Sequence, residues 1–335
     1  MSGAVRRRFA DGRWHFQHGP IDCILAADGE RAAIAASVES ACARLESVLA
    51  ELVGELPLLR TDLSSPVGPA VAPRGPVARR MVGACRAHAT DGRFVTAMAA
   101  VAGSVAEELI AHFERPGIER AYVNNGGDIA LHLAAGAAFE IGIVADPGAA
   151  LAAACPAAHA PVPSGRFRIG AASGVRGIAT SGWRGRSLSF GIADSATVLA
   201  ISASTADAAA TVIANAVDVD DPRIRRAPAD SLRDDSDLGA RLVTCDVPLL
   251  PAVLVDAALD AGLAAAEGEC AAGRAIAVAL SLQGRVRTAV ARAAFDTLRA
   301  SPCSGARAAP NRLPPPSSGR ASWLDTRSDA NALPA

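Results

Sequence analysis

The sequence predicts an α+β fold in which helices pack on a mainly antiparallel sheet. Short apolar segments rich in Val, Ile and Leu occur in pairs joined by turns that contain Gly, Asn or Pro, as in β-hairpins. Longer segments with apolar residues at helical spacing separate these pairs, and hairpins interleaved with helices are typical of α+β domains. Hydrophobic residues make up 50% of the 335 positions, which is enough for a sizeable core.

The N-terminal part of the chain is expected to contain one hairpin and three helices. Apolar residues from Ala33 to Leu52 recur at helical spacing, and Gly54 can end that helix. A proline-rich stretch then predicts an extended surface connection. The expected elements are two strands within 13–26 around Gly19-Pro20, a helix over 29–53, the connection over 56–76, a helix over 77–88 and a helix over 93–113.

The rest of the chain is expected to supply most of the strands. Runs of apolar and β-branched residues predict strands, and a charged run with prolines predicts a solvated connection. We expect strands over 121–124, 129–133, 139–147, 165–173, 175–183 and 195–202, a loop over 148–164, a helix that begins at Ser204, the charged connection over 219–239, a helix over 251–267 and a hairpin over 274–290 that turns at Gln283-Gly284. Residues 1–298 then form a single domain, and the tail 301–335, rich in Pro, Ser, Gly and Arg, is expected to be disordered.

Composition argues against several classes of protein. The formal net charge of −1 argues against nucleic-acid binding, and the absence of a run of about 18 apolar residues argues against a membrane span. The chain has no lysine, which excludes a lysine Schiff base and a Walker lysine. Dispersed cysteines without a CxxC pair, and Arg6–Arg8 without an apolar segment after them, predict a leaderless cytoplasmic protein with reduced thiols.

Three polar side chains recur every fourth position on the alanine-rich helix expected after Ser204. Asp207, Thr211 and Asn215 therefore lie on one face of that helix. One interpretation is structural, with Ser204 as the N-cap, Asp207 completing a capping box and Thr211 bonded to a backbone carbonyl. The other is a Mg²⁺ site, because carboxylate, hydroxyl and carbonyl oxygens suit this cation and substrate phosphates complete its coordination.

A second polar stretch, Asn124 to Asp128, links two predicted strands. Asn-Gly and Gly-Gly adopt positive φ at little cost, so a hairpin turn is one interpretation. The alternative is a loop whose backbone N–H groups bind an anion while Asp128 binds a polar group. The stretch 180–182 gathers further polar atoms at a strand end, and Gly103 in a helix indicates either a helix crossing or the approach of a ligand.

Four stretches in one order resemble the superfamily of ApbE, the FAD:protein FMN transferase, and most closely its short branch, UPF0280. VNNGGDI at 123–129 is similar to the family's V-N-x-G-G-D-I, and FEIGIVADP at 139–147 is similar to the strand that follows it. IATSGW at 178–183 and TADAAAT at 205–211 are similar to the family's A-T-S-G and A-D-A-x-A-T segments. The resemblance is good over residues 93–218, and four segments in register are far more specific than any one of them.

This resemblance implies a T-fold-like α+β architecture with a flavin-nucleotide site that uses Mg²⁺. The family's metal ligands correspond to Asp207 and Thr211. FAD would be the substrate or ligand, with a flavin-acceptor protein as partner, and a homodimer is left open. The residues implied to line the nucleotide site are Asn125, Gly126, Gly127 and Asp128 on one wall and Thr180, Ser181 and Gly182 on the other.

Two departures from the transferase bear on the implied chemistry. The transferase has a Gly-x-x-x-Lys-Gly segment where Ala102-Gly103 stands in this chain. It also has a His-x-x-Asp-Pro segment where residues 189–196 are SFGIADSA, so that Gly191 replaces the histidine while Asp194 is retained. Two basic groups of the transferase are therefore missing.

Three functions follow from the resemblance and these departures. The first is transfer of FMN from FAD to a protein hydroxyl, with Asp128 and Asp194 as candidate general bases. The second is an enzyme of the same pocket that acts on a small heterocyclic metabolite. The third is a non-catalytic flavin- or nucleotide-binding protein, since a fold and a pocket can persist when the chemistry changes.

Overall fold

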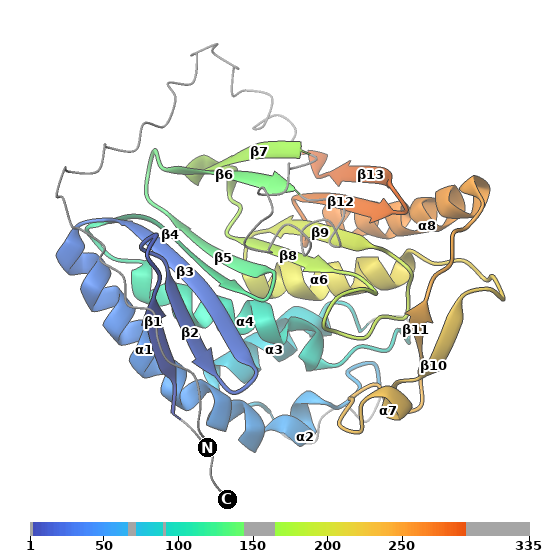
Figure 1. The fold of residues 1–335 in the computed structure, drawn as a ribbon, viewed down its shortest axis with the longest axis horizontal. Helices are drawn as coiled ribbons and strands as arrows, with labels where there is room; N and C mark the ends of the chain where they lie inside the picture. Colours follow the sequence, from blue (N-terminus) through green and yellow to red (C-terminus); the bar gives the residue numbers. More distant parts are fainter. Residues whose placement is uncertain (1–2, 66–71, 90–91, 144–164, 293–335) are drawn as a thin grey trace, which may run out of the picture. The chain divides into compact units, whose positions relative to one another are not determined.

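The computed structural model describes residues 3–65, 72–89, 92–143 and 165–292. Within these ranges the chain forms a nine-stranded sheet of order β1-β2-β3-β4-β5-β8-β9-β12-β13 (Figure 1). Every neighbouring pair of strands is antiparallel, which confirms the predicted fold class. The strands are β1 (Val5–Arg8), β2 (Trp14–His18), β3 (Ile21–Gly29), β4 (Ile118–Asn125), β5 (Asp128–Leu133), β8 (Gly177–Ser181), β9 (Ser195–Ala200), β12 (Ala277–Leu282) and β13 (Arg285–Val290).

Two separate pairs of strands complete the sheets of the described ranges. β6 (Ala138–Ile143) pairs with β7 (Gly165–Gly170), and β10 (Arg225–Pro228) pairs with β11 (Leu242–Asp246). The β6–β7 pair lies on the face of the large sheet that the long helices leave open (Figure 1), where Phe139 packs against the core.

The long helices lie on the other face of the large sheet (Figure 1). Short 3₁₀ turns flank α4 on both sides. No helix in the described ranges is both long and apolar enough to cross a membrane. The helices are α1 (Arg31–Gly54), α2 (Leu56–Leu59), α3 (Pro76–Arg86), α4 (Val101–Ile110), α6 (Ala203–Ala216), α7 (Ala229–Leu232) and α8 (Ala252–Ala271).

Strand alternation decides which side chains share the helix-covered face. In β4, Ala121 and Val123 are buried with residues of α1, α3 and α4, whereas Tyr122 packs towards β6 and β7. In β8, Ala179 packs with α6, whereas Ile178 packs on the opposite face. Two hydrophobic clusters therefore lie between sheet and helices, one under α1, α3 and α4 and the other under α6 and α8.

The predicted hairpins and most predicted helices are present, although several ends shift. The helix expected over 93–113 begins only at Ala97, as a 3₁₀ turn that leads into α4. The connection over 56–76 contains α2, and the charged run over 219–239 contains β10 and α7, so both were wrongly expected to lack regular structure. The expectations for 148–164 and for the tail lie outside the described residues, and the single domain stays a prediction.

Candidate functional site

The site is built on the place where α4 crosses α6. A Cβ atom added at Gly103 would overlap the backbone carbonyl of Ala203, so only glycine permits this approach of the two helices. The helix-crossing interpretation of Gly103 is therefore confirmed. The crossing places the first turn of α4 beside the Asp207 side chain, whose Cβ also lies close to Gly103.

At this crossing, each helix has a carboxylate that accepts hydrogen bonds from the first turn of the other helix. Oδ2 of Asp207 accepts the backbone N–H of Gly103 at 2.8 Å, in the first turn of α4. In return, Oε2 of Glu107 accepts the backbone N–H of Ser204 at 3.0 Å and its hydroxyl at 2.8 Å, in the first turn of α6. Each helix thus satisfies N–H groups that the other leaves unpaired and places a negative charge at its positive end.

This exchange corrects the expected start of the helix. The N-cap of α6 is Ser202, whose hydroxyl accepts the N–H of Thr205 at 3.3 Å, and not Ser204. The interpretation in which Asp207 completes a capping box with Ser204 is therefore wrong as well. The reason is tertiary, because the groups of Ser204 that a cap would use are bound by Glu107 of another helix.

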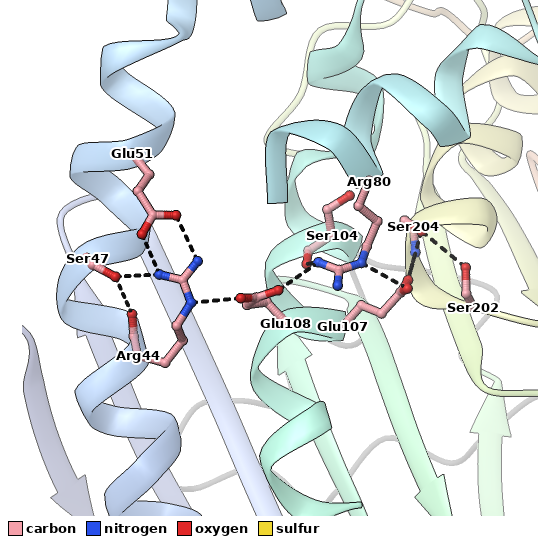
Figure 2. Close-up of polar contacts among 9 residues, drawn as sticks. All are labelled: Arg44, Ser47, Glu51, Arg80, Ser104, Glu107, Glu108, Ser202 and Ser204. Carbon is pink, nitrogen blue, oxygen red and sulfur yellow. Dashed lines mark hydrogen bonds and ion pairs between the residues drawn. The ribbon is translucent and has the colours of Figure 1, made fainter. Parts of the chain in front are cut away.

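Figure 2 shows that Glu107 is the end of a chain of ion pairs between α1, α3 and α4, and that Glu107 also accepts hydrogen bonds from Ser204 of α6. The side chains of Arg44 and Glu108 are only 17% and 12% exposed, so solvent screens their attraction less than that of a surface pair. The chain fixes the start of α6, and with it Asp207. Its pairs are Glu107–Arg80 at 3.0 Å, Arg80–Glu108 at 3.0 Å, Glu108–Arg44 at 2.7 Å and Arg44–Glu51 at 2.7 Å.

The β4–β5 hairpin turns at Gly126 and Gly127, with φ of 69° and 119°. Oδ1 of Asn124 accepts the N–H of Gly127 at 2.8 Å, which closes the turn and confirms the hairpin interpretation. Asn125 is buried, and its Nδ2 donates to the carbonyl of Ala102 at 3.1 Å. The turn is thereby tied to the start of α4, next to Asp207.

Asp128, the first residue of β5, lies close enough to Asp207 for the charges of the two carboxylates to interact. Both side chains are half-buried. Burial, and after it the charge of Asp128, raises the pKa of Asp207 well above its usual value. Burial also raises the pKa of Asp128 to about 7, although the N–H of Thr180 and the charge of Arg186 oppose this. Two such carboxylates favour a shared proton or a cation between them.

The remaining predicted polar residues of α6 divide between two neighbours. Oγ1 of Thr211 lies 3.5 Å from the carbonyl oxygen of Ala99, just before α4. Oδ1 of Asn215 accepts the N–H of Phe190 at 2.9 Å and the hydroxyl of Ser189 at 3.0 Å. Thr211 therefore lies on the same side as Asp207, whereas Asn215 holds a loop.

The stretch 180–182, predicted as the second wall of the nucleotide site, contributes mainly backbone groups to that site. The Thr180 hydroxyl bonds Thr197 at 2.9 Å on the face away from the helices, so only the N–H of Thr180 reaches Asp128. Ser181 is half-buried and alternates onto the helix-covered face with Ala179. At Gly182 a Cβ would overlap the Asp194 carbonyl, so this glycine permits close strand packing.

The second candidate base, Asp194, has other partners. Its Oδ1 pairs with Nε of Arg184 at 3.1 Å, and its Oδ2 accepts the N–H of Gln283 at 2.6 Å. These bonds hold the β12–β13 turn beside β9. Among the described residues, no hydrogen bond or ion pair links Asp194 to Asp128 or Asp207.

Arg186 is the site residue that the sequence did not indicate. It lies in the exposed loop between β8 and β9, and a Cβ at Gly126 would overlap its guanidinium. In a chain whose only permanent side-chain cations are arginines, no local pattern distinguishes this one from the others. The missing lysine and histidine were the only signal that another cation should be sought.

The donor set fits Mg²⁺ better than a transition metal. The described residues contain no group of three or more His, Cys, Asp or Glu side chains that could hold a metal. Two carboxylates, the Thr211 hydroxyl and nearby carbonyls are hard oxygen donors, and Mg²⁺ typically uses one or two carboxylates with waters and substrate phosphates. Asp207 and Thr211 therefore remain the proposed metal ligands.

Two cavities lie away from the carboxylate pair. One, of about 740 Å³, is lined by β3, β4, β6 and β7 and includes Arg120 and Tyr122. The other, of about 570 Å³, lies between the end of α1 and the start of α3 and includes Arg44 and Glu55. Neither includes Asp128 or Asp207.

The comparisons with known proteins identify the family. The family model described as "AbpE bacteria" matches residues 6–288, and the chain belongs to this family. A UPF0280 protein of Methanothrix thermoacetophila is 32% identical over 206 residues, which are 61% of this chain and 76% of the relative. A UPF0280 protein of Methanosphaerula palustris is 38% identical over 144 residues, 42% of this chain and 52% of the relative. The resemblance to UPF0280 within the ApbE-like superfamily is thus confirmed.

Two solved structures resemble the chain distantly. The apo form of the flavinyl transferase ApbE of Pseudomonas stutzeri is 14% identical with a TM-score of 0.36, covering 88% of this chain and 96% of that one. The ApbE protein of Thermotoga maritima is 13% identical with a TM-score of 0.37, covering 88% and 98%. The family assignment rests on the family model and the UPF0280 relatives, not on these two.

Proposed function

We propose that the protein binds a flavin nucleotide together with Mg²⁺ and transfers FMN from FAD to a hydroxyl of an acceptor protein. The observation that supports this best is that Asp207 and the glycine turn are both hydrogen-bonded to the start of α4, where the charges of Asp128 and Asp207 interact. The family assignment supports the flavin, and the hard oxygen donors support the cation.

Asp207 and Thr211 would hold Mg²⁺, which when bound neutralises charge on the diphosphate. Asn125 and Gly103 keep the start of α4 and Asp207 in register for this role. The acceptor oxygen bonds to the phosphorus of the FMN half, the bond from that phosphorus to the bridging oxygen breaks, and AMP leaves. Asp128 accepts the hydroxyl proton as the general base.

Binding and release of AMP test this proposal directly. The full-length chain is incubated with FAD, with a threonine-containing acceptor, and with either Mg²⁺ or EDTA. We expect Mg²⁺-dependent FAD binding by fluorescence and Mg²⁺-dependent AMP by mass spectrometry. No FAD binding under either condition would contradict the proposal.

The two candidate bases are separated by matched substitutions. Asp128→Asn is expected to lower the rate of AMP release on the order of a hundredfold or more, since a general base contributes about that much. Asp194→Asn removes a carboxylate whose partners are Arg184 and Gln283 and is expected to leave the rate within a few-fold. Equal losses in both variants, with unchanged thermal stability, would mean that Asp128 has no special place in the reaction.

A binding protein without transfer is the second candidate. At Gly191, where the transferase has histidine, a Cβ would overlap the carbonyl of Ala214. This position has no room for a side chain, so the missing histidine is part of how this chain packs, whereas Ala102 stands in place of the lysine. Tight Mg²⁺-dependent FAD binding without any AMP would support this candidate over transfer.

A further inference from the structure

We infer that Arg186 binds the diphosphate of the nucleotide at this site and supplies the positive charge for which the chain has no lysine. This deepens the proposed function and rests on it. The guanidinium lies against Gly126 in the turn that carries Asp128.

To bind phosphate oxygens at this turn, the protein needs a hydrogen-bond donor from outside the turn. The N–H of Gly127 already donates to Asn124, and Nδ2 of Asn125 already donates to Ala102. The glycine turn therefore has few free donors for phosphate oxygens. An arginine guanidinium has five N–H donors in a planar fork that matches two phosphate oxygens at once.

The guanidinium is also free to turn towards a ligand. Arg186 is exposed, and no ion pair of the described residues includes it. Arg184 in the same loop is different, because it pairs with Asp194 and its guanidinium lies 4.7 Å from the Trp183 ring centroid. Of these two arginines, Arg186 is thus the one with no hydrogen bond or ion pair among the residues that the structure describes.

Arg186 and Mg²⁺ would repel one another until a diphosphate lies between them. The positive charge of the guanidinium acts on Asp128 and opposes the rise in its pKa, so Arg186 stands within reach of a cation bound at the carboxylate pair. Two cations at so short a distance weaken each other's binding, because their charges repel one another. An anion that contacts both cations removes this repulsion. The metal and the diphosphate should therefore bind cooperatively, with Arg186 as one source of the coupling.

Arg186 should strengthen the binding of a diphosphate and weaken the binding of Mg²⁺ alone. These opposite effects distinguish an anion-binding role from a structural one. Arg186→Ala is expected to weaken binding of ADP with Mg²⁺ on the order of tenfold to a hundredfold, as for the loss of a charged hydrogen bond. The same variant is expected to bind Mg²⁺ alone as tightly as the wild type or up to about tenfold more tightly. Riboflavin, which has no phosphate, should bind equally well to both proteins.

The experiment is isothermal titration of full-length wild type, Arg186→Ala, Arg186→Lys and the matched control Arg184→Ala. The probes are FAD, ADP, inorganic pyrophosphate, riboflavin and Mg²⁺ alone. Arg186→Lys should keep part of the affinity for ADP, since an ammonium retains the charge without the fork. Arg184→Ala should bind ADP like the wild type.

Several outcomes would overturn the inference. One is unchanged ADP affinity in Arg186→Ala while the wild type binds ADP, which would leave the proposed flavin function intact. Another is equal loss of ADP, riboflavin and Mg²⁺ binding, which would indicate a structural role. A wild type that binds ADP and pyrophosphate through Arg186 but does not bind FAD would support the inference. It would contradict the proposal that the nucleotide is a flavin. A wild type that binds no phosphate compound would contradict both.

Discussion

The carboxylate of Asp207 combines two roles that the sequence presents as alternatives. It accepts an N–H group at the start of a helix, and it faces a second carboxylate at a candidate metal site. Both roles fit one conformation because the helix that it caps is α4 and not its own. The hydrogen bond to Gly103 uses Oδ2, and the side chain is only half-buried.

Substitutions at Asp207 separate these roles. Asp207→Asn keeps an oxygen for the Gly103 N–H and removes repulsion with Asp128, so without metal its free energy of unfolding should equal or exceed that of the wild type. Asp207→Ala loses the cap and should be less stable by about 1 kcal/mol. Urea unfolding in EDTA measures the change in unfolding free energy of both variants. Added Mg²⁺ should raise the melting temperature of the wild type and of neither variant. A Mg²⁺ effect that persists in both variants would rule out Asp207 as a ligand.

At the scale of elements, the α4–α6 crossing depends on the absence of a side chain at one position. Helix propensity alone favours alanine over glycine by about 1 kcal/mol. At Gly103 this preference is opposed by overlap with the backbone of Ala203, which cannot move without shifting α6. Gly83 in α3 offers the matched case, since a Cβ there would meet nothing within 4 Å.

The two glycines should respond to alanine with opposite signs. Gly83→Ala is expected to raise the free energy of unfolding by about 0.5–1 kcal/mol. Gly103→Ala is expected to lower it by about 1–3 kcal/mol and to weaken Mg²⁺ binding, because Asp207 moves with α6. Chemical denaturation of both variants and Mg²⁺ titration of the second measure these effects. Stabilisation by Gly103→Ala would show that the crossing is looser than the structure has it.

Elements set by local chemistry were predictable from the sequence, and those set by distant contacts were not. Gln283 and Gly284 both adopt positive φ, of 47° and 79°, and their turn was predicted from residue type alone. The start of α6 was misplaced because Glu107, 97 positions from Ser204 in the chain, binds the groups that an N-cap would use. Only the fold brings Arg186 to Gly126.

At the scale of the molecule, the candidate site lies where two hydrophobic clusters meet. α4 belongs to the cluster under α1 and α3, and α6 belongs to the cluster that it shares with α8. A second polar link joins the same two groups of helices away from the site. His88, just after α3, is fully buried, and its Nδ1 lies 3.4 Å from Oε1 of Glu269 in α8. Nε of Arg274 lies 2.6 Å from Oε2 of the same carboxylate.

The contacts of Glu269 with His88 and Arg274 should make the free energy of unfolding depend on pH. Burial alone would raise the pKa of Glu269, but contacts with His88 and Arg274 outweigh it and lower the pKa from 4.5 to about 2. A carboxyl whose pKa is lower in the folded state stabilises the fold above its unfolded pKa and loses this effect as the pH falls towards the folded pKa. The contribution, on the order of 2–3 kcal/mol, should therefore be complete above about pH 4.5 and decline towards pH 2.

Comparison of Glu269→Gln with the wild type isolates this contribution from the titration of other carboxylates. Urea unfolding from neutral pH down to about pH 3 gives the difference in unfolding free energy between the two proteins. We expect the difference to be largest above about pH 4.5, where Glu269 is ionised in both states, and to narrow below it. Because no hydrogen bond or ion pair of the described residues joins Glu269 or His88 to Asp128 or Asp207, Mg²⁺ should shift both proteins equally. A difference that stays constant over the whole range would mean that glutamine fails through packing and that the ion pairs contribute nothing.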